Sequence, residues 1–183
     1  MHSTRYGKVC RNCRSAVLLS PAAVLAFLLF FSWFAPALAF EPVDCAAGHP
    51  HWSDSEPKLN LVHIFCGEIN RRDKPVGFHA RPQGRDPATA RVAKVLDSAN
   101  PAGVYTARIE VLDGERWKEK FSSFFPDRLS QHQVVQLILT AYEESGGGQR
   151  WEGRSGAGFR IQGYEIEIDG ETRINTAYPL YQR

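Results

Sequence analysis

Several features that would identify a protein class are missing from this sequence of 183 residues. It contains no internal repeat, and its Gly-rich stretch at residues 153–158 lacks the spacing of a P-loop. His49 and His51 form a pair with no further ligand beside them, and two ligands do not make a metal site. The sequence therefore gives no sign of a repeat array or a P-loop, and we expect neither a metal nor a cofactor.

Acidic residues are absent from the first 39 positions, which have the composition of an export signal. Four basic residues between positions 5 and 14 precede an almost continuous apolar run at 16–34, and residues 37–39 supply a small-x-small cleavage site. We expect cleavage after Ala39, which would leave a secreted or periplasmic protein with no stable membrane association. An uncleaved amino-terminal anchor is the alternative, because the apolar run is long enough to span a bilayer.

A global excess of positive charge is also absent once the signal is removed. Four of the 22 Lys and Arg residues lie in the signal, so the remaining 18 face 20 Asp and Glu residues and the net charge becomes −2. Residues 70–94 are the exception, with seven basic residues, two acidic residues and a local charge of +5. A globally basic surface for nucleic acid is excluded, but this segment can attract a negatively charged substrate.

Cysteines are few. Cys10 and Cys13 fall inside the signal and have no second pair of ligands, so we interpret them as incidental. Cys45 and Cys66 remain in the exported part, where an oxidising compartment favours a disulfide between them. Two free buried thiols are the alternative.

The exported part has the pattern of an α+β fold, a single compact domain of antiparallel hairpins with one main helix. Asp113-Gly114 and Asp169-Gly170 each separate two strand-like segments, which is a strong hairpin signal. Ser130 and Gln133 form a capping box at the start of the helix, and glycines at 146–148 end it. The expected extended segments are 60–69, 76–79, 104–112, 115–125, 159–168 and 171–178, and the expected apolar helix face consists of Val134, Leu137, Ile138 and Ala141.

Two histidines are the first candidates for catalysis. His63 and His79 lie in apolar settings on either side of a short basic turn. Imidazole titrates near neutrality, so one ring can accept a proton while its partner donates one. Such a pair suits phosphodiester cleavage, although a single histidine in an apolar strand is more often structural.

Other polar residues are candidates for substrate contacts. Lys118 and Lys120 share one face of the predicted strand 115–125, where either ammonium can stabilise charge on a phosphate. Thr176 and Tyr178 share one face of the last predicted strand, where an aromatic ring can stack on a base. Ser155 lies in the Gly-rich loop, whose hydroxyl and N–H groups can bind a phosphate. Solvated lysines, a core tyrosine and an ordinary hairpin connection explain these patterns as well.

Taken together, these motifs resemble the bacterial EndoU endoribonuclease domain. The resemblance covers nearly all of the exported part in the right order, and its most specific elements are the histidine pair and the T-A-Y-P ending. The motifs are H-I-F-C-G-E-I at 63–69, G-F-H at 77–79, K-F-S-S-F-F-P-D at 120–127, S-G-A-G-F-R-I-Q-G-Y at 155–164 and T-A-Y-P-L-Y at 176–181.

The resemblance implies RNA cleavage, either metal-independent or metal-assisted, in which the ribose 2′-hydroxyl attacks the adjacent phosphate. The products are a 2′,3′-cyclic phosphate and a 5′-hydroxyl. His79 would be the general base and His63 the general acid, although these proton roles can be exchanged. Lys120, or Lys118 on the same face, would stabilise the pentacoordinate phosphate. The nucleotide pocket would be lined by Ser155, Thr176 and Tyr178. Arg154 replaces a threonine-like residue of relatives, which leaves the base preference open.

The resemblance also implies partners and a domain organisation. RNA would be the substrate, and because bacterial relatives often form the toxic tips of contact-dependent inhibition systems, a cognate immunity or inhibitor protein would be a partner. Residues 1–39 would be the signal, 40–59 an N-terminal arm and 60–183 the nuclease domain. Two rival functions remain: an exported module that binds RNA or another polyanion without cleaving it, and a structural envelope protein anchored by an uncleaved leader.

Overall fold

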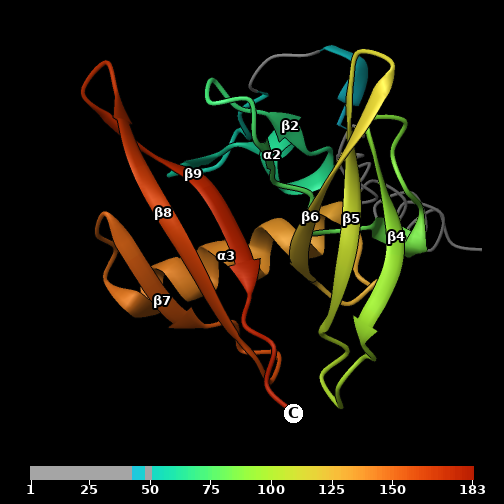
Figure 1. Cartoon of the computed structure of the whole chain (residues 1–183). Coiled ribbons are helices and arrows are strands. Elements are labelled where there is room, and N and C mark those ends of the chain that lie inside the picture. Colours follow the sequence, from blue (N-terminus) through green and yellow to red (C-terminus); the bar gives the residue numbers. More distant parts are fainter. Residues whose placement is uncertain (1–42, 48–50) are drawn as a thin grey trace, which may run out of the picture. The chain divides into compact units, whose positions relative to one another are not determined.

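Long hairpins dominate the described part of the chain, residues 43–47 and 51–183 of this computed structural model (Figure 1). These residues belong to one compact unit, Phe40–Arg183. The predicted signal at residues 1–39 and its cleavage site lie outside the described residues, as do Cys10, Cys13 and His49. Within the part that is described, no helix is long and apolar enough to cross a membrane.

Two sheets and a small hairpin contain the strands. The first sheet has the antiparallel order β4-β5-β6, with β4 (Ala90–Asp97), β5 (Tyr105–Asp113) and β6 (Arg116–Phe124). The second has the order β1-β9-β8-β7, with β1 (Lys58–Leu59), β9 (Glu171–Pro179), β8 (Arg160–Ile168) and β7 (Arg150–Arg154). A separate pair consists of β2 (Glu68–Ile69) and β3 (Pro75–Val76). The helical elements are η1 (Cys45–Ala47), α2 (Leu61–Phe65), η2 (Pro82–Gly84) and α3 (Gln131–Ser145). Mostly sheet with one main helix, the described chain is an α+β fold.

Two strand edges face each other in the middle of the fold (Figure 1). β6 is the last strand of its sheet. β1 pairs with β9 only at Arg173 and Ile174, so the C-terminal half of β9 is also an unpaired edge on that side. Side chains near these edges can therefore line a space that neither sheet fills alone.

The long helix α3 begins and ends where the sequence predicts. Gln133 N donates to Ser130 Oγ at 3.2 Å, and Ser130 N donates to Gln133 Oε1 at 2.8 Å, which confirms the capping box. Gly146 ends the helix with a φ of 77°. The buried face is slightly rotated from the predicted one, because Val135 is buried whereas Leu137 is only partly buried.

Both predicted hairpins form, but their turns differ. Asp169 and Gly170 have φ values of 54° and 78°, so both central residues adopt the left-handed conformation that a tight Asp-Gly hairpin requires. In the other hairpin Asp113 pairs with Arg116, and the two loop residues are Gly114 and Glu115. Only Gly114, with a φ of 61°, has positive φ there, so the turn lies one residue later than predicted.

The predicted strand over residues 60–69 is wrong. This segment forms α2, which Asn60 caps by accepting a hydrogen bond from His63 N at 3.2 Å, and then β2. All five residues of α2 are buried, so the run has no exposed side and its periodicity cannot distinguish a short helix from a buried strand. Strands β4 and β7 were not among the predicted segments.

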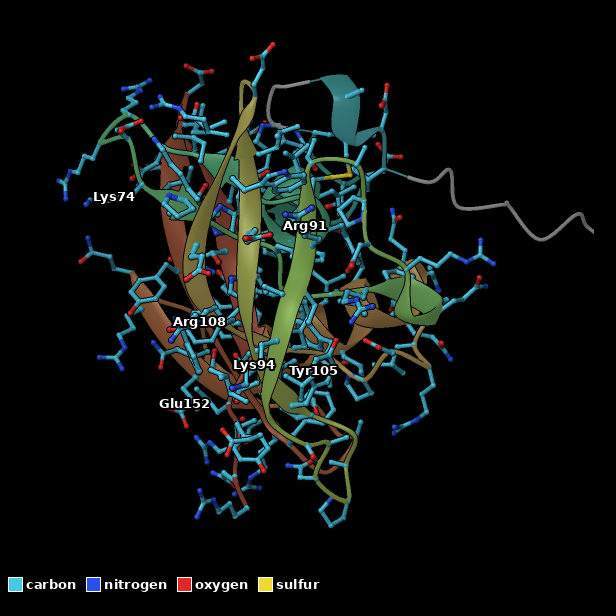
Figure 2. All side chains as sticks on the ribbon, turned by 45° about the vertical axis from the view of Figure 1, so that its right-hand side comes forward. Lys74, Arg91, Lys94, Tyr105, Arg108 and Glu152 are labelled. Carbon is cyan, nitrogen blue, oxygen red and sulfur yellow. A yellow bond between two sulfur atoms is a disulfide. The ribbon has the colours of Figure 1, made fainter. Side chains whose placement is uncertain are left out.

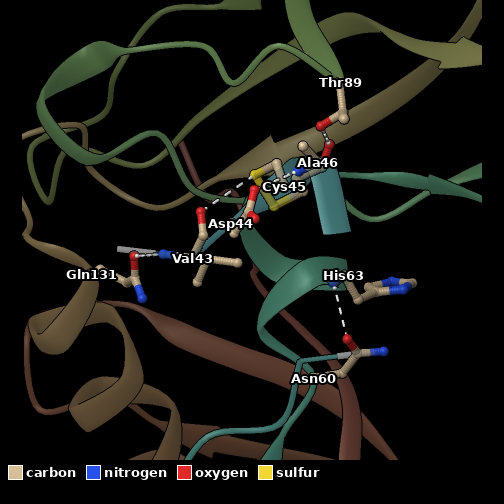
Figure 3. Close-up of a disulfide and its surroundings, with 9 residues drawn as sticks. Val43, Asp44, Cys45, Ala46, Asn60, His63, Thr89 and Gln131 are labelled. Carbon is tan, nitrogen blue, oxygen red and sulfur yellow. Dashed lines mark hydrogen bonds between the residues drawn. A yellow bond between two sulfur atoms is a disulfide. The ribbon is translucent and has the colours of Figure 1, made fainter. Parts of the chain in front are cut away.

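A disulfide joins the start of the described chain to α2. Cys45 in η1 is bonded to Cys66, the C-cap of α2, with 5.4 Å between their Cα atoms (Figure 3). Nearby, Val43 N donates to Gln131 Oε1 at 3.2 Å, and Thr89 Oγ1 donates to Cys66 O at 2.8 Å. The C-cap of the helix that carries His63 is thus held by the disulfide and by Thr89, and the segment before Cys45 is joined to Gln131 at the start of α3.

Gly77 permits the closest contact between the β2–β3 hairpin and α2. Its φ is +74°, and a Cβ built on it would lie 2.2 Å from His63 O. Directly after it, Phe78 N donates to His63 O at 2.8 Å. A side chain at position 77 would therefore separate the hairpin from the helix.

We expect Gly77→Ala to lower the free energy of unfolding by about 3 kcal/mol or more, because it combines backbone strain with a clash against main chain. Gly114→Ala is the matched control, since Gly114 also has positive φ but nothing lies within 4 Å of its built Cβ. That control should cost only about 1 kcal/mol. Urea unfolding of both variants measures the difference, and equal losses would contradict the close approach.

Candidate active site

A pocket of about 450 Å³ lies between α2, the segment after β3 and the edges of β6 and β9. The structure brings together in it most of the site residues suggested by the sequence. Its lining includes His63, His79, Lys120, Phe121, Thr176 and Tyr178.

Main-chain hydrogen bonds set the relative position of the two histidines. Phe78 N donates to His63 O, and His79 N donates to Ile64 O at 2.7 Å. Both histidine side chains are buried, and their ring centroids lie 6.1 Å apart with 30° between the planes. A group the size of a phosphate between the rings could therefore contact both.

His63 is oriented by a carboxylate. Its Nδ1 lies 2.8 Å from Glu68 Oε1, on β2. An ionised carboxylate only accepts hydrogen bonds, so Nδ1 donates here and Nε2 remains available to a ligand.

His79 has the opposite surroundings. Its Nδ1 lies 3.2 Å from Ser123 O, which can only accept, and 2.9 Å from Ser122 Oγ, whose hydroxyl donates to Phe78 O at 2.7 Å. Nδ1 therefore carries the proton, and Nε2 has a free lone pair. Burial, with the charges of Lys120 and His63 as smaller causes, holds the pKa of His79 well below its ordinary value of 6.5. A neutral ring of this kind can accept a proton.

The structure distinguishes the two candidate lysines. Lys120 lines the pocket, where its Nζ donates to Gly77 O at 2.9 Å and burial lowers its pKa to about 8. Lys118 instead forms ion pairs with Asp73 and Asp113 at the end of the β5–β6 hairpin, and these hydrogen bonds raise its pKa. Lys120 is thus the lysine whose ammonium is available inside the pocket.

The wall formed by β9 carries an aromatic ring and an unpaired hydroxyl. The Tyr178 ring lies 5.3 Å from the His79 ring, and its hydroxyl accepts a hydrogen bond from Gln162 Nε2 at 2.8 Å. Burial and the nearby Tyr164 raise the pKa of Tyr178 to about 12, so it remains a neutral phenol. Thr176 Oγ1 is buried and has no hydrogen-bond partner among the described residues. It is placed to bond a ligand in the pocket.

Ser155 lies elsewhere. It is buried in the loop between β7 and β8, where its hydroxyl donates to Phe159 O at 2.7 Å and accepts from Ala157 N at 3.1 Å. It is not among the residues that line the histidine pocket. In this arrangement its hydroxyl stabilises the loop.

Three polar contacts at the site were not anticipated from the sequence. Glu68 orients His63, Ser122 contacts His79, and Gln162 holds the hydroxyl of Tyr178. Strand alternation predicts Ser122 on the same face as Lys120, but it does not predict the contact with His79. Glu68 and Gln162 gave no such signal, because their roles depend on how separate segments meet in space.

Comparison with known proteins identifies the family of this chain. The family model described as bacterial EndoU nuclease matches residues 59–181, which include every residue named above as lining the pocket. The chain belongs to the bacterial EndoU nuclease family.

One relative of this domain has a name that indicates a role. A Bacillus cereus protein named "Toxin" is 33% identical over 122 residues, which cover 65% of this chain. The chain spans only 22% of the length of that relative. No solved structure gives a significant match. Membership of the bacterial EndoU nuclease family implies nuclease activity.

We expect NMR of ring nitrogens to find His79 neutral and protonated at Nδ1 at pH 6.5, with its pKa below that value. Because protonation of a buried ring is unfavourable, the fold should also lose stability as the pH falls below 6.5.

Lys120→Met should raise the pKa of His79 by removing a neighbouring charge, though not to its ordinary value, since burial is the larger cause. A His79 ring that titrates at 6.5 or above would contradict these contacts.

We expect Lys120→Met to raise the free energy of unfolding at pH 7 by about 1–2 kcal/mol, because the buried ammonium is unfavourable and only the bond to Gly77 O offsets it. This gain should shrink as the pH rises from about 8 towards 10.5, where lysine also loses its proton in the unfolded chain. Lys118→Met is the control and should give no gain, since Lys118 is ion-paired. Denaturant unfolding at several pH values tests both.

Proposed function

We propose that this EndoU domain is an exported endoribonuclease that cleaves RNA by transesterification. The observation that supports the proposal is a pair of histidines in one pocket with opposite surroundings. His79 is buried beside a carbonyl and has a lowered pKa, whereas His63 bonds a carboxylate. A neutral ring with a free Nε2 lone pair can act as the base, and a ring whose Nδ1 is held by a carboxylate presents its Nε2 to act as the acid.

In the proposed reaction, His79 Nε2 removes the proton of the ribose 2′-hydroxyl. The resulting oxygen attacks the adjacent phosphorus, and the bond from phosphorus to the 5′-oxygen breaks. His63 Nε2 gives its proton to that leaving oxygen. The products are a 2′,3′-cyclic phosphate and a 5′-hydroxyl, and Glu68 holds the His63 ring in position for the transfer.

The remaining pocket residues fit a nucleotide. The Lys120 ammonium is placed to stabilise the additional negative charge on the phosphate oxygens in the transition state. Tyr178 offers a ring face beside His79 for a base or ribose, and the unpaired Thr176 hydroxyl offers a hydrogen bond. Ser155 has no contact with the substrate in this scheme.

The export and toxin roles rest on the sequence and on the relative. The signal composition of residues 1–39 and the Cys45–Cys66 disulfide are consistent with function outside the cytoplasm. The similarity to the Bacillus cereus protein named "Toxin" supports a toxin role. A producer of such a toxin would need an immunity protein to protect its own RNA. The export and the toxin role are both part of the proposal.

We expect the purified protein to cut an oligonucleotide that contains one uridine and to leave a cyclic phosphate, detected by mass spectrometry. His63→Ala and His79→Ala should each lower kcat/KM by about 10²–10⁴-fold, and Lys120→Met by about 10²–10³-fold. Lys118→Met should cleave normally. Replacing the uridine by its 2′-deoxy form should abolish cleavage, because the nucleophile is then missing.

The outcomes separate the rival functions. Cleavage of the 2′-deoxy substrate would contradict the transesterification. Binding of RNA with no cleavage by the unmodified protein would favour a binding module, and the absence of both would favour a structural role. Circular dichroism of each variant checks that a lost activity is not a lost fold.

A further inference from the structure

Phe121 is an exposed aromatic ring at the mouth of the catalytic pocket. Its exposed fraction is 61%, the largest among the exposed large hydrophobic residues in the described chain, which also include Val95 and Leu96. Exposing such a ring is unfavourable, and Phe121 comes directly after Lys120 on the edge strand β6. The exposure of this ring beside the pocket therefore points to a function.

A second, smaller pocket adjoins the catalytic one at Phe121. It measures about 260 Å³ and is lined by Leu96, Arg108, Glu119, Lys120 and Phe121. Lys120 and Phe121 line both pockets. A linear polymer bound in the catalytic pocket can therefore continue into the second one.

Basic side chains lie beside Phe121 on the same sheet. Arg108 of β5 is the register partner of Phe121, and Lys94 of β4 is the register partner of Arg108. Figure 2 shows Arg108 and Lys94 close together on this sheet. Both basic residues are exposed, so this part of the surface presents a ring and two cations in a row.

The ion pair at Arg108 can be exchanged for a phosphate. Arg108 NH1 lies 3.3 Å from Glu119 Oε2, and both side chains are more than half exposed. Exposed pairs of this kind contribute little stability, whereas arginine binds phosphate oxygens through charge-assisted hydrogen bonds. An aromatic ring with a nearby arginine is the combination that binds successive nucleotides of a single strand.

We propose that Phe121 stacks on the base of a nucleotide flanking the scissile phosphate, and that Arg108 binds a phosphate of that nucleotide. The inference rests on the proposed ribonuclease function and extends it to a second subsite for single-stranded RNA. Tyr178, which lines only the catalytic pocket, and Phe121, which lines both pockets, then contact different nucleotides.

The test compares a dinucleotide with tetranucleotides extended on the 5′ or the 3′ side. For the unmodified protein, one of the extensions should raise kcat/KM. In Phe121→Ala this advantage should fall by about 5- to 100-fold, the effect of losing one stacked base. Phe121→Trp should retain it, and Val95→Ala should behave as the unmodified protein, because Val95 is an exposed apolar residue that lines neither pocket.

A binding measurement separates this inference from the proposed function. Oligonucleotides with 2′-deoxyuridine at the cleavage site and 2-aminopurine as the flanking base report stacking without turnover. Weaker binding and lost fluorescence quenching in Phe121→Ala support the subsite even if the protein cleaves nothing. Unchanged binding, together with an unchanged advantage of the longer substrates, would overturn it.

Discussion

The site depends on how the backbone of residues 77–79 lies against α2. Two hydrogen bonds from this segment to the carbonyls of His63 and Ile64 fix the two histidines relative to each other. The absence of a side chain at Gly77 allows the segment to lie this close to α2. The same segment offers its own carbonyls to β6, where Lys120 and Ser122 donate to them. The positions of all three catalytic candidates therefore follow from main-chain contacts, which do not change when a ring gains or loses a proton.

The same backbone arrangement also places the two histidine side chains in different electrostatic surroundings. His63 lies in the middle of α2 and reaches the carboxylate of Glu68, whereas His79 lies beside β6, close to a carbonyl and a lysine. The pKa of a group follows from burial, neighbouring charges and hydrogen bonds, so one residue type can serve as acid and base a few ångströms apart. The stability lost by burying Lys120 is consistent with a group kept for reaction rather than for folding.

Local signals predicted the fold well wherever one residue's neighbours in sequence decide its conformation. The Ser130 capping box and the Asp-Gly hairpins formed because caps and tight turns use hydrogen bonds and φ values within a few residues. The segment 60–69 was misjudged because α2 has no exposed side and its conformation is set by Asn60 and by tertiary packing. Strand β4 was missed because register irregularities near Val92 and Val95 interrupt its alternation.

The sequence by itself determined the chemistry available to this protein: two histidines, two lysines on one strand face, and a terminal Thr-Ala-Tyr-Pro, together with the family to which they belong. Only the tertiary structure decided which of them act together. It directed Lys120 into the pocket and Lys118 to Asp73 and Asp113, gave His63 its carboxylate, placed Ser155 in a loop away from the pocket, and exposed Phe121 beside a second one. The physical reason is that the pKa of a group, its burial and the partners that its side chain contacts depend on distances between segments far apart in the chain. Residue types and spacing do not encode those distances.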